Sequence, residues 1–369
     1  MVERTHSPNL GEMAGKLDTY RSKRDSSKTP EPDSDGAGDG GGGRFVVHEH
    51  HARNLHWDLR LEHDGVLLSW ALPRGVPQLP DKEANRLAVH TEDHPLEYID
   101  FEGEIPAGEY GAGRMKIWDS GTYEAEKLRS DEVIASFEGE RLRGRYALFQ
   151  TRGKNWIIHR IDPPLDPGRA LIPDDLRPIL PRRGKLPRNQ ADYGFEIALG
   201  GLRTLVWCEP GHIRKAESRG LPNTVELFPE LRGIARQLGM TEAVLDGEIV
   251  VLDGDGRPSA TQLRERKRAG SESAARRASE REPATLMLFD LLFVDGRAVM
   301  ELPYRQRRSL LEELQLEGAA WQTPAYHRSD GGELLEAARE QRLAGLVAKR
   351  LDSHYEPGKR SDAWIKVEA

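Results

Sequence analysis

Residues 55–62 read LHWDLRLE, and this stretch decides the first half of the fold. Successive side chains of a β-strand point to opposite faces of a sheet, so residues two apart share a face. The leucines and the tryptophan fall on one face, which suits a hydrophobic core. The other face carries His56, Asp58, Arg60 and Glu62. The alternation therefore predicts a strand with one apolar face and one face that bears ionisable groups.

Segments with the same alternation extend on both sides of this strand, from Arg44 to about Ile161. They include RFVVHEH, RMKIWDSGTYEAEKL and RYALFQTRGKNWIIHRI, and they are separated by turn sequences such as HDG and DSG. Short alternating strands joined by such turns are typical of an antiparallel sheet or barrel. We therefore predict a small antiparallel β-structure for this part of the chain.

Three segments lack the pattern of a folded element. Residues 32–43 (PDSDGAGDGGGG) have almost no apolar side chains and many glycines, which predicts a disordered linker. Residues 1–16 are expected to be a flexible N-terminus. Residues 161–188 are rich in proline and arginine and are predicted to be a second linker.

The remainder, residues 189–369, mixes strand and helix patterns. AVLDGEIVVLD and LMLFDLLFVDG look like hairpin strands, while RQRRSLLEEL and GGELLEAARE have the spacing of amphipathic helices. Together with the first half, this predicts an α+β chain of two domains.

Composition restricts the class of protein. Of 369 residues, 37% are hydrophobic and 31% are charged, as in a soluble globular protein. We find no apolar run near the roughly 20 residues of a membrane span, no signal-peptide pattern and a single cysteine, so we expect a cytoplasmic protein without membrane contact. The net charge of −7 means that any nucleic-acid contact must come from local basic patches.

The histidines suggest a metal site. Seven of the twelve lie between His48 and His94. His50, His56 and Asp58 would supply two imidazoles and a carboxylate, a set that suits Mn²⁺, Zn²⁺ or Fe²⁺ and leaves positions open for water and substrate. If this triad forms, we expect it on the inward side of the barrel. The alternative is a solvated strand face, but the histidine density and the nearby arginine favour a metal.

Phosphate chemistry fits the groups around this triad. Arg60 lies on the same strand face as Asp58 and could hold an anion in bidentate fashion. Arg86, His94 and Tyr98 could donate hydrogen bonds to phosphate oxygens, and His94 could protonate a leaving alkoxide. The glycine-rich run FEGEIPAGEYGAG is interpreted as structural.

Several motifs together resemble a known family. HxxxxxHxDxRLE, SWALPRG, RLAVHTEDHPLEY and FEGEIPAGEYGAG are similar to the 3′-phosphoesterase domain of the bacterial non-homologous end-joining ligases (ligase D), over residues 17–160. The resemblance implies a compact β-barrel with flanking helices that removes 3′-phosphates and 3′-ribonucleotides using manganese. It makes His50, His56 and Asp58 the metal ligands.

The same resemblance extends the active site. It implies phosphate-binding or catalytic roles for Arg60, Arg86, His94 and Tyr98. It also gives a role to three residues of the N-terminal segment KRDSSKTPEP, which composition alone would assign to a solvated tail: Arg24, Asp25 and Glu31.

Two residues depart from the family pattern. His48 stands where the family usually has glutamine, and Arg74 where it has lysine. Arg74 keeps the charge but changes the geometry of a phosphate contact. His48 would either add a metal contact or weaken the site. Rate and substrate preference, rather than metal binding itself, depend on these two positions.

Residues from about Asp192 onward resemble the adenylation domain of ATP-dependent DNA ligases, a nucleotidyltransferase-like α+β fold. The matching runs include FEIALGGLR, VLDGEIVVLDGDGRPS and GLVAKRLDSHYEPGKRSDAW. Such ligases need a lysine nucleophile in ExKxDGxR. Here Ala198 occupies that position, Gly200 replaces the aspartate, and Ala344 and Glu368 replace a glutamate and a lysine. Because the sequence stops at Ala369, we expect no OB-fold domain.

Other residues of this motif set are retained and indicate a vestigial nucleotide site: Glu196, Arg203, Glu248, Lys349 and Lys366. Whether the domain binds ATP stays open. Lys215 could replace the lost nucleophile only if the site refolded. Cys208 could attack phosphate in principle, but a cysteine with apolar neighbours is more often a packing residue.

These observations favour a Mn²⁺-dependent 3′-phosphoesterase acting on DNA or DNA–RNA 3′ ends in double-strand-break repair. Its second domain would be a pseudo-adenylation scaffold. Two alternatives remain, an ATP-dependent DNA ligase and a non-catalytic end-binding scaffold that recruits Ku, a separate ligase or a polymerase. We expect a bacterial, nucleoid-associated protein.

Overall fold

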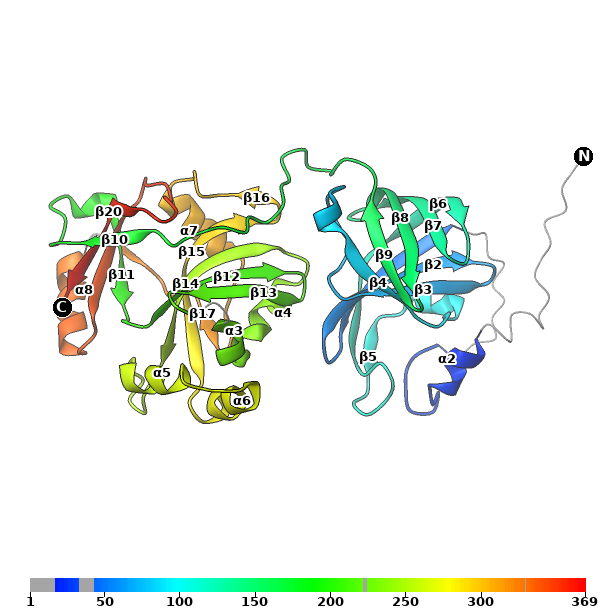
Figure 1. The fold of residues 1–369 in the computed structure, drawn as a ribbon, viewed down its shortest axis with the longest axis horizontal. Helices are drawn as coiled ribbons and strands as arrows, with labels where there is room; N and C mark the ends of the chain where they lie inside the picture. Colours follow the sequence, from blue (N-terminus) through cyan, green and yellow to red (C-terminus); the bar gives the residue numbers. More distant parts are fainter. Residues whose placement is uncertain (1–16, 33–42, 222–223, 329) are drawn as a thin grey trace, which may run out of the picture. The chain divides into compact units, whose positions relative to one another are not determined.

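The computed structural model describes residues 17–32, 43–221, 224–328 and 330–369. The chain divides after Arg169 into two compact units, which are described separately (Figure 1). The expected flexible N-terminus and residues 33–42 of the expected glycine-rich linker lie outside the described residues.

The first unit is a closed barrel, as predicted. Its strands run in the order β1-β2-β3-β4-β9-β8-β7-β6, and β6 pairs back with β1, while β5 adds to the edge of β6. The strands are β1 (Arg44–His51), β2 (Leu55–His63), β3 (Val66–Leu72), β4 (Arg86–His90), β5 (Gly103–Ile105), β6 (Gly113–Leu128), β7 (Glu132–Gly139), β8 (Arg143–Arg152) and β9 (Asn155–Arg160).

A two-residue turn sets the register at the decisive strand. Asp64 and Gly65 both have positive φ (46° and 77°) and join β2 to β3, with His63 opposite Val66. Two-residue hairpin turns of type I′ need positive φ at both positions, which Asp-Gly supplies. The HDG signal in the sequence therefore fixes which residues of β2 and β3 share a face.

The two faces of β2 have different neighbours. Trp57, Leu59 and Leu61 are fully buried, and the same face carries Phe45, whose ring contacts Phe137 of β7 at 5.1 Å between centroids. Ring contacts of this kind between strands that do not pair form the aromatic core of the barrel. The polar face of β2 lies on the opposite side.

Short helices cover that opposite face. Tyr20 of α2 (Asp18–Ser22) and Leu96, Tyr98 and Ile99 of η2 (Leu96–Asp100) pack against side chains of β1, β3 and β6. A third short helix, η1 (Lys82–Ala84), follows β3. Flanking helices are thus present, and two of them enclose the polar face of β2.

The second unit has two sheets with helices between and around them. One sheet has the order β10-β20-β19-β11-β18, and the other β13-β12-β14-β15-β16, with β17 pairing β15. The strands are β10 (Leu180–Arg183), β11 (Tyr193–Ala198), β12 (Leu202–Glu209), β13 (His212–Ser218), β14 (Ala243–Val251), β15 (Ala284–Val294), β16 (Arg297–Ala298), β17 (Trp321–Gln322), β18 (His327–Arg328), β19 (Gly345–Arg350) and β20 (Arg360–Glu368).

The helical elements of this unit are η3 (Gln190–Asp192), α3 (Thr224–Leu227), η4 (Pro229–Arg232), α4 (Gly233–Leu238), α5 (Ala260–Arg266), α6 (Glu272–Arg281), α7 (Tyr304–Glu313) and α8 (Gly331–Glu340). The predicted hairpin strands are β14 and β15, which pair with each other, and the predicted amphipathic helices are α7 and α8. The α+β class with two domains is confirmed.

The proline- and arginine-rich segment 161–188 differs from the expected linker. From Ala170 on it belongs to the second unit, where Ile172 and Ile179 are buried in a hydrophobic cluster. Residues 180–183 form β10, which pairs in parallel with β20. The isolated isoleucines carry no periodic pattern, so the sequence hides their burial. Within the described ranges, no helix is long and apolar enough to span a membrane.

Candidate active site

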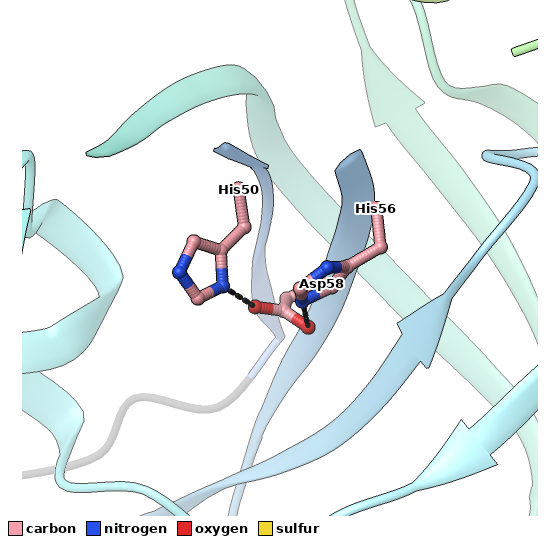
Figure 2. A group of neighbouring side chains, drawn as sticks. All are labelled: His50, His56 and Asp58. Carbon is pink, nitrogen blue, oxygen red and sulfur yellow. Dashed lines mark ion pairs between the residues drawn. The ribbon is translucent and has the colours of Figure 1, made fainter. Parts of the chain in front are cut away.

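Three predicted metal ligands come together on the polar face of β2. His50 of β1 lies directly opposite His56 of β2, and Asp58 follows two residues later on the same face. Asp58 Oδ2 is 3.7 Å from His50 Nδ1, and Asp58 Oδ1 is 3.6 Å from His56 Nε2 (Figure 2). One ligand atom from each of the three lies within 4.8 Å of the others.

Backbone carbonyls set the tautomers of both histidines. His50 Nε2 lies 2.8 Å from the carbonyl oxygen of Gly111, and His56 Nδ1 lies 3.0 Å from that of Asn54. A carbonyl oxygen only accepts, so each of these ring nitrogens carries the proton. In the neutral imidazoles, the lone pairs of His50 Nδ1 and His56 Nε2 therefore face Asp58.

Two lone pairs and a carboxylate facing one another repel unless a cation lies between them. Their separations of 3.6–3.7 Å exceed a hydrogen bond. They match two ligands about 2.1 Å from one ion at an angle near 120°. Metal-binding histidines usually donate their second ring N–H to a carbonyl or carboxylate. The donor set thus fits a divalent ion such as Mn²⁺, Zn²⁺ or Fe²⁺.

The ionised state of Asp58 is maintained by its neighbours. Burial alone would raise the pKa of Asp58, but the charge of Arg60 lowers that pKa well below its usual range. Arg60 is itself buried, with Nη2 3.2 Å from Asp58 Oδ2, Nη1 donating to Ser69 Oγ at 2.9 Å and the guanidinium 4.6 Å from the Tyr98 ring centroid. Arg60 therefore stands behind the carboxylate and stabilises its charge.

The triad lines a cavity of about 470 Å³. Its wall also includes Arg24, Glu31, Arg60, His94 and Tyr98, all of which the sequence placed in the site. This cavity is not on the inward side of the barrel, where the triad was expected. It lies on the face opposite the aromatic core, because the period of two that buries Trp57 turns Asp58 the other way.

His94, the expected proton donor, is buried and bonded within the cavity wall. Its Nδ1 donates to the Glu92 carbonyl at 2.8 Å, so Nε2 is left to accept from Arg24 Nη2 at 3.3 Å. Burial and then the charges of Arg60 and Arg24 lower the pKa of His94 well below its usual value. A neutral imidazole is therefore favoured, and it accepts from Arg24 and helps to hold that guanidinium. Proton donation to a leaving group stays a prediction.

The N-terminal segment completes the cavity. Arg24 Nε donates to Glu31 Oε1 at 2.8 Å, and its Nη1 lies 3.2 Å from Glu92 Oε1. The Tyr98 hydroxyl donates to the same Glu31 oxygen at 2.9 Å. Residues 17–32 are thereby fixed to the barrel through buried ion pairs, although their composition suggests a solvated tail.

Two predicted site residues do not line the cavity. Arg86 shares a strand face with Ala88 and His90, and His90 is opposite Trp70, whereas the cavity face of β3 carries Ala71. The period of two therefore turns Arg86 away from the triad. Asp25 instead accepts hydrogen bonds from Ser27 and pairs with Lys28, and these contacts lower the pKa of Asp25 to about 2.

The two departures from the family pattern have different positions. His48 is fully buried and accepts from Arg60 Nε at 3.3 Å through Nδ1. Burial and then the Arg60 charge lower the pKa of His48 to about 3, so it stays neutral, and it is not part of the triad. Arg74 is exposed and does not line the cavity.

Sequence reasoning missed several residues of the site. Gly111 orients His50, and Tyr110 beside it lines the cavity, yet both belong to the glycine-rich run interpreted as structural. Glu92 pairs with Lys23 and Arg24. Ser69 connects Arg60 to His94. Gly111 adopts a positive φ (79°) in its loop. The sequence shows a glycine there but does not reveal this backbone conformation.

A second cavity lies between the sheets of the second unit and gathers the retained motif residues. It is lined by Glu196, Ala198, Arg203, Glu248, Lys349 and Lys366. Lys349 Nζ is 2.5 Å from Glu196 Oε2, and the rings of Phe289 and Trp364 lie 4.2 Å from that nitrogen. Tyr304 donates its hydroxyl to the other oxygen of Glu196. The Lys349 ammonium is therefore already paired and enclosed.

Arg203 and Glu248 are also occupied by the protein itself. Arg203 makes a two-pronged ion pair with buried Asp246 at 2.6 and 2.5 Å. Burial would lower the pKa of Arg203, but Asp246 raises it above its usual value. Burial raises the pKa of Glu248, which accepts from the backbone N–H groups of Leu199 and Gly201.

Neither alternative nucleophile reaches this cavity. Lys215 Nζ donates to the Asp174 carbonyl at 2.6 Å, lies 4.1 Å from the Trp207 ring centroid and does not line the cavity. Cys208 is fully buried, and burial raises the pKa of its thiol to about 12. Ala198 itself offers a methyl group.

Each half of the chain matches a known protein family. Residues 48–150 match the family described as the DNA ligase D 3′-phosphoesterase domain, and residues 185–368 match the ATP-dependent DNA ligase domain. The multifunctional non-homologous end joining protein LigD of Mycolicibacterium smegmatis is 42% identical over 96% of this chain and 46% of its own length. The LigD of Pseudomonas aeruginosa is 34% identical over 98% of this chain and 47% of its own length.

The chain spans about half the length of the curated relatives it matches. A solved structure described as mycobacterial DNA ligase D complexed with ATP and MES shares 34% identity, with a TM-score of 0.45, over 52% of this chain and 60% of that one.

Proposed function

The chain belongs to the LigD family, with a 3′-phosphoesterase domain followed by an ATP-dependent DNA ligase domain, and from this premise we propose that it is a Mn²⁺-dependent 3′-phosphoesterase. Its substrates are DNA or DNA–RNA 3′ ends in double-strand-break repair. We assign this activity to residues 17–160 and a pseudo-adenylation scaffold to residues 189–369.

One observation carries the proposal. His50 and His56 both direct an unprotonated ring nitrogen toward the ionised Asp58, and each is held in that tautomer by a backbone carbonyl. Such an arrangement has negative charge and lone pairs in excess and needs a cation. A solvated strand face would not combine burial, fixed tautomers and a depressed carboxyl pKa.

A divalent ion held by His50, His56 and Asp58 would supply Lewis acidity toward a phosphate ester and activate a water. Arg60 keeps Asp58 ionised. Arg24, held by Glu31, Glu92 and His94, presents a guanidinium at the cavity wall, where it can donate to phosphate oxygens. Tyr98 fixes Glu31, so its contribution is to position Arg24.

The second unit has a different role in this proposal. Its cavity has no lysine at position 198, and Lys349 is paired with Glu196. It serves as a scaffold with a vestigial nucleotide site, and sealing is left to a separate ligase. Ku and a polymerase are the other partners we propose, in a bacterial cytoplasm at the nucleoid.

The decisive experiment compares wild type with His56→Ala and His51→Ala. The substrate is a 3′-phosphorylated primer–template with Mn²⁺, and phosphate release is measured. His51 is next to His50 but turned away from the triad and 38% exposed. We expect His56→Ala to lose at least about 100-fold in rate, since even outer-shell groups cost 10- to 100-fold, and His51→Ala to remain active.

Two outcomes would reject the proposal. Equal activity of His56→Ala and wild type would remove the triad from catalysis. If wild type binds the primer–template but releases no phosphate, the end-binding scaffold becomes the better account. Transfer of AMP from labelled ATP to the chain would instead favour the ligase.

A further inference from the structure

An exposed aromatic ring lies in the wall of the cavity that the triad lines. Tyr110 lines this cavity and is 48% exposed. The other tyrosine of the wall, Tyr98, is 1% exposed, and its hydroxyl donates to Glu31 at 2.9 Å. Aromatic side chains bury a large area when a ligand covers them, and they dominate many binding sites for this reason. Of the two tyrosines, Tyr110 has the ring that a ligand can cover.

The loop that carries Tyr110 is held in place on both sides of the ring. The carbonyl of the next residue, Gly111, lies 2.8 Å from His50 Nε2. Gly113 has a φ of 143°, and a Cβ added there would lie 2.4 Å from the carbonyl oxygen of His51, so only glycine lets the loop end this close to β1. A ring on such a fixed loop loses little freedom when a ligand binds.

Two cations lie beside the ring. Lys23 Nζ donates to the Tyr110 hydroxyl at 3.2 Å and lies 4.7 Å from the ring centroid. The Arg24 guanidinium lies 5.3 Å from the same centroid. Proteins that bind single strands combine cations that follow the phosphates with aromatic rings on which bases stack. Tyr110 and its neighbours offer both parts in one wall.

The β5–β6 loop and β6 add apolar side chains to the cavity. Ile105, Ala112 and Met115 line it together with Tyr110. A phosphate ion alone gains nothing from such groups, whereas a nucleobase that covers them removes apolar surface from water. The cavity therefore combines a charged part, formed by the triad and Arg24, with an apolar part that suits a flat ring.

A single exposed ring suits the end of a strand. Inside a strand each base is stacked between two neighbours, whereas the last base has one face without a neighbour on its own strand. Tyr110 is one residue from Gly111, the partner of His50, and both line the same cavity of about 470 Å³. A cavity of this size is typical of a small-molecule site. A base on Tyr110 and a phosphate at the triad can therefore belong to one terminal nucleotide.

Resting on the proposed function, we propose that Tyr110 binds the 3′-terminal nucleotide by stacking on its base, while the triad takes its phosphate. The ring accepts all four bases, because every base has a π-face. Stacking is equally strong before and during phosphate release, so it lowers KM and leaves kcat unchanged. The glycine-rich run thus contributes a substrate-binding residue as well as turns.

The test uses the full chain and a cycle between the ring and the base. One 3′-phosphorylated primer–template ends in thymidine, and the other ends in an abasic tetrahydrofuran analogue. KM and kcat for phosphate release with Mn²⁺ are measured for wild type, Tyr110→Leu, Tyr110→Phe and the matched control Phe149→Leu. Phe149 is 38% exposed on β8 and does not line the cavity.

On the thymidine end, Tyr110→Leu should raise KM by about 5- to 150-fold without changing kcat, the range for loss of one stacked base. On the abasic end, Tyr110→Leu and wild type should agree within about twofold, because the base that the ring contacts is absent. Tyr110→Phe keeps the ring and should restore tight binding of the thymidine end, and Phe149→Leu should behave like wild type.

Two results would overturn the proposal. An equal loss in Tyr110→Leu on both substrates, or a loss in Tyr110→Phe as large as that in Tyr110→Leu, would mean that the hydroxyl acts only by holding Lys23 and the N-terminal segment. Unchanged KM in Tyr110→Leu would mean that the base lies elsewhere.

A binding measurement separates this inference from the proposed activity. A primer with a 3′-hydroxyl and a terminal 2-aminopurine is not hydrolysed, and stacking quenches its fluorescence. At saturating protein, wild type and Tyr110→Phe should quench it more strongly than Tyr110→Leu does. Such quenching without phosphate release by wild type would refute the activity and leave the stacking intact. Equal quenching by wild type and Tyr110→Leu would refute the stacking, whether or not the chain is active.

Discussion

Asp58 in the barrel and Lys349 in the second unit are both buried charges at the wall of a cavity, and their partners differ. Arg60 forms an ion pair with Asp58, while the lone pairs of one ring nitrogen each of His50 and His56 face the same carboxylate. Lys349 has Glu196 at 2.5 Å and aromatic rings around its ammonium. The first arrangement gathers a carboxylate and ring nitrogens that suit a cation, and the second pairs a buried ammonium with a carboxylate of the protein.

The difference teaches that burial of a charge does not by itself mark a working site. A buried ion pair is often a structural feature that could be replaced without loss of stability. A working site presents an imbalance that only a ligand corrects. By this criterion the triad of the barrel fits a metal, while Lys349 of the second cavity is already balanced by Glu196.

Replacing Asp58 by asparagine should give the largest effect, because it removes the charge on which the comparison depends. We expect more than about 100-fold slower phosphate release and loss of measurable Mn²⁺ binding by calorimetry. The matched control is Asp64→Asn, in the exposed β2–β3 turn, where asparagine tolerates positive φ. Unchanged Mn²⁺ affinity in Asp58→Asn would mean that the lone pairs face something other than a metal.

Arg24→Gln should have the next largest effect. The guanidinium is shared by Glu31, Glu92 and His94, so its removal leaves Glu31 without its cation and Glu92 with Lys23 alone. We expect kcat/KM for 3′-phosphate removal to fall between about 10- and 100-fold. Lys28→Gln, 61% exposed on the same segment, is the control. If Arg24→Gln retained full activity, the N-terminal segment would be only a cover for the barrel.

The sequence predicts the triad because a strand has a simple period, which places His56 and Asp58 on one face of β2, and because His50 ends the strand-like run just before it. His50, His56 and Asp58 follow from counting residues along β1 and β2. The same rule, applied to β4, would have turned Arg86 away, since Arg86 shares a face with Ala88 and His90. The expectation for Arg86 rested on the donor type of its side chain and on the family resemblance, and neither gives the orientation of the side chain.

Other parts of the site depend on contacts between segments far apart in the chain. Glu92 meets Lys23 and Arg24 across nearly 70 residues, and the Gly111 carbonyl meets His50 across 61. No local pattern encodes such pairs. The pKa of His94 is lowered by burial and by two arginines that the fold brings to it, and the residue type alone does not show this.

A pH titration of stability tests how far Lys349 is shielded from water in the second cavity. Burial lowers the pKa of Lys349 from 10.5 to about 8, although Glu196 acts in the opposite direction. Between pH 8 and 10.5 the unfolded chain binds a proton that the folded chain does not. Stability from this group therefore rises with pH across that window, by at most about 1.4 kcal/mol per unit.

Lys349→Met should lack this rise, whereas Lys359→Met, 73% exposed, should keep it. The free energy of unfolding in urea is measured for wild type and both variants at each pH, so that contributions of other groups cancel in the differences. NMR of labelled lysine in wild type should show that the Lys349 amine titrates near pH 8. A Lys349 amine that titrates near 10.5 would mean that the cavity is open to water.

The smallest effect is expected from ATP. After incubation with labelled ATP and Mn²⁺ or Mg²⁺, the denatured chain should carry no covalent nucleotide, because position 198 is alanine and the Lys349 amine is paired with Glu196. Peptide mass spectrometry, with Lys349→Arg and Lys366→Arg as controls, would locate any adduct. An adduct at Lys349 would break the comparison, since the enclosed amine would then be a nucleophile. Phosphate release by the barrel in the same sample shows that the chain is folded, so a negative result reports the chemistry of the second cavity and not the loss of the protein.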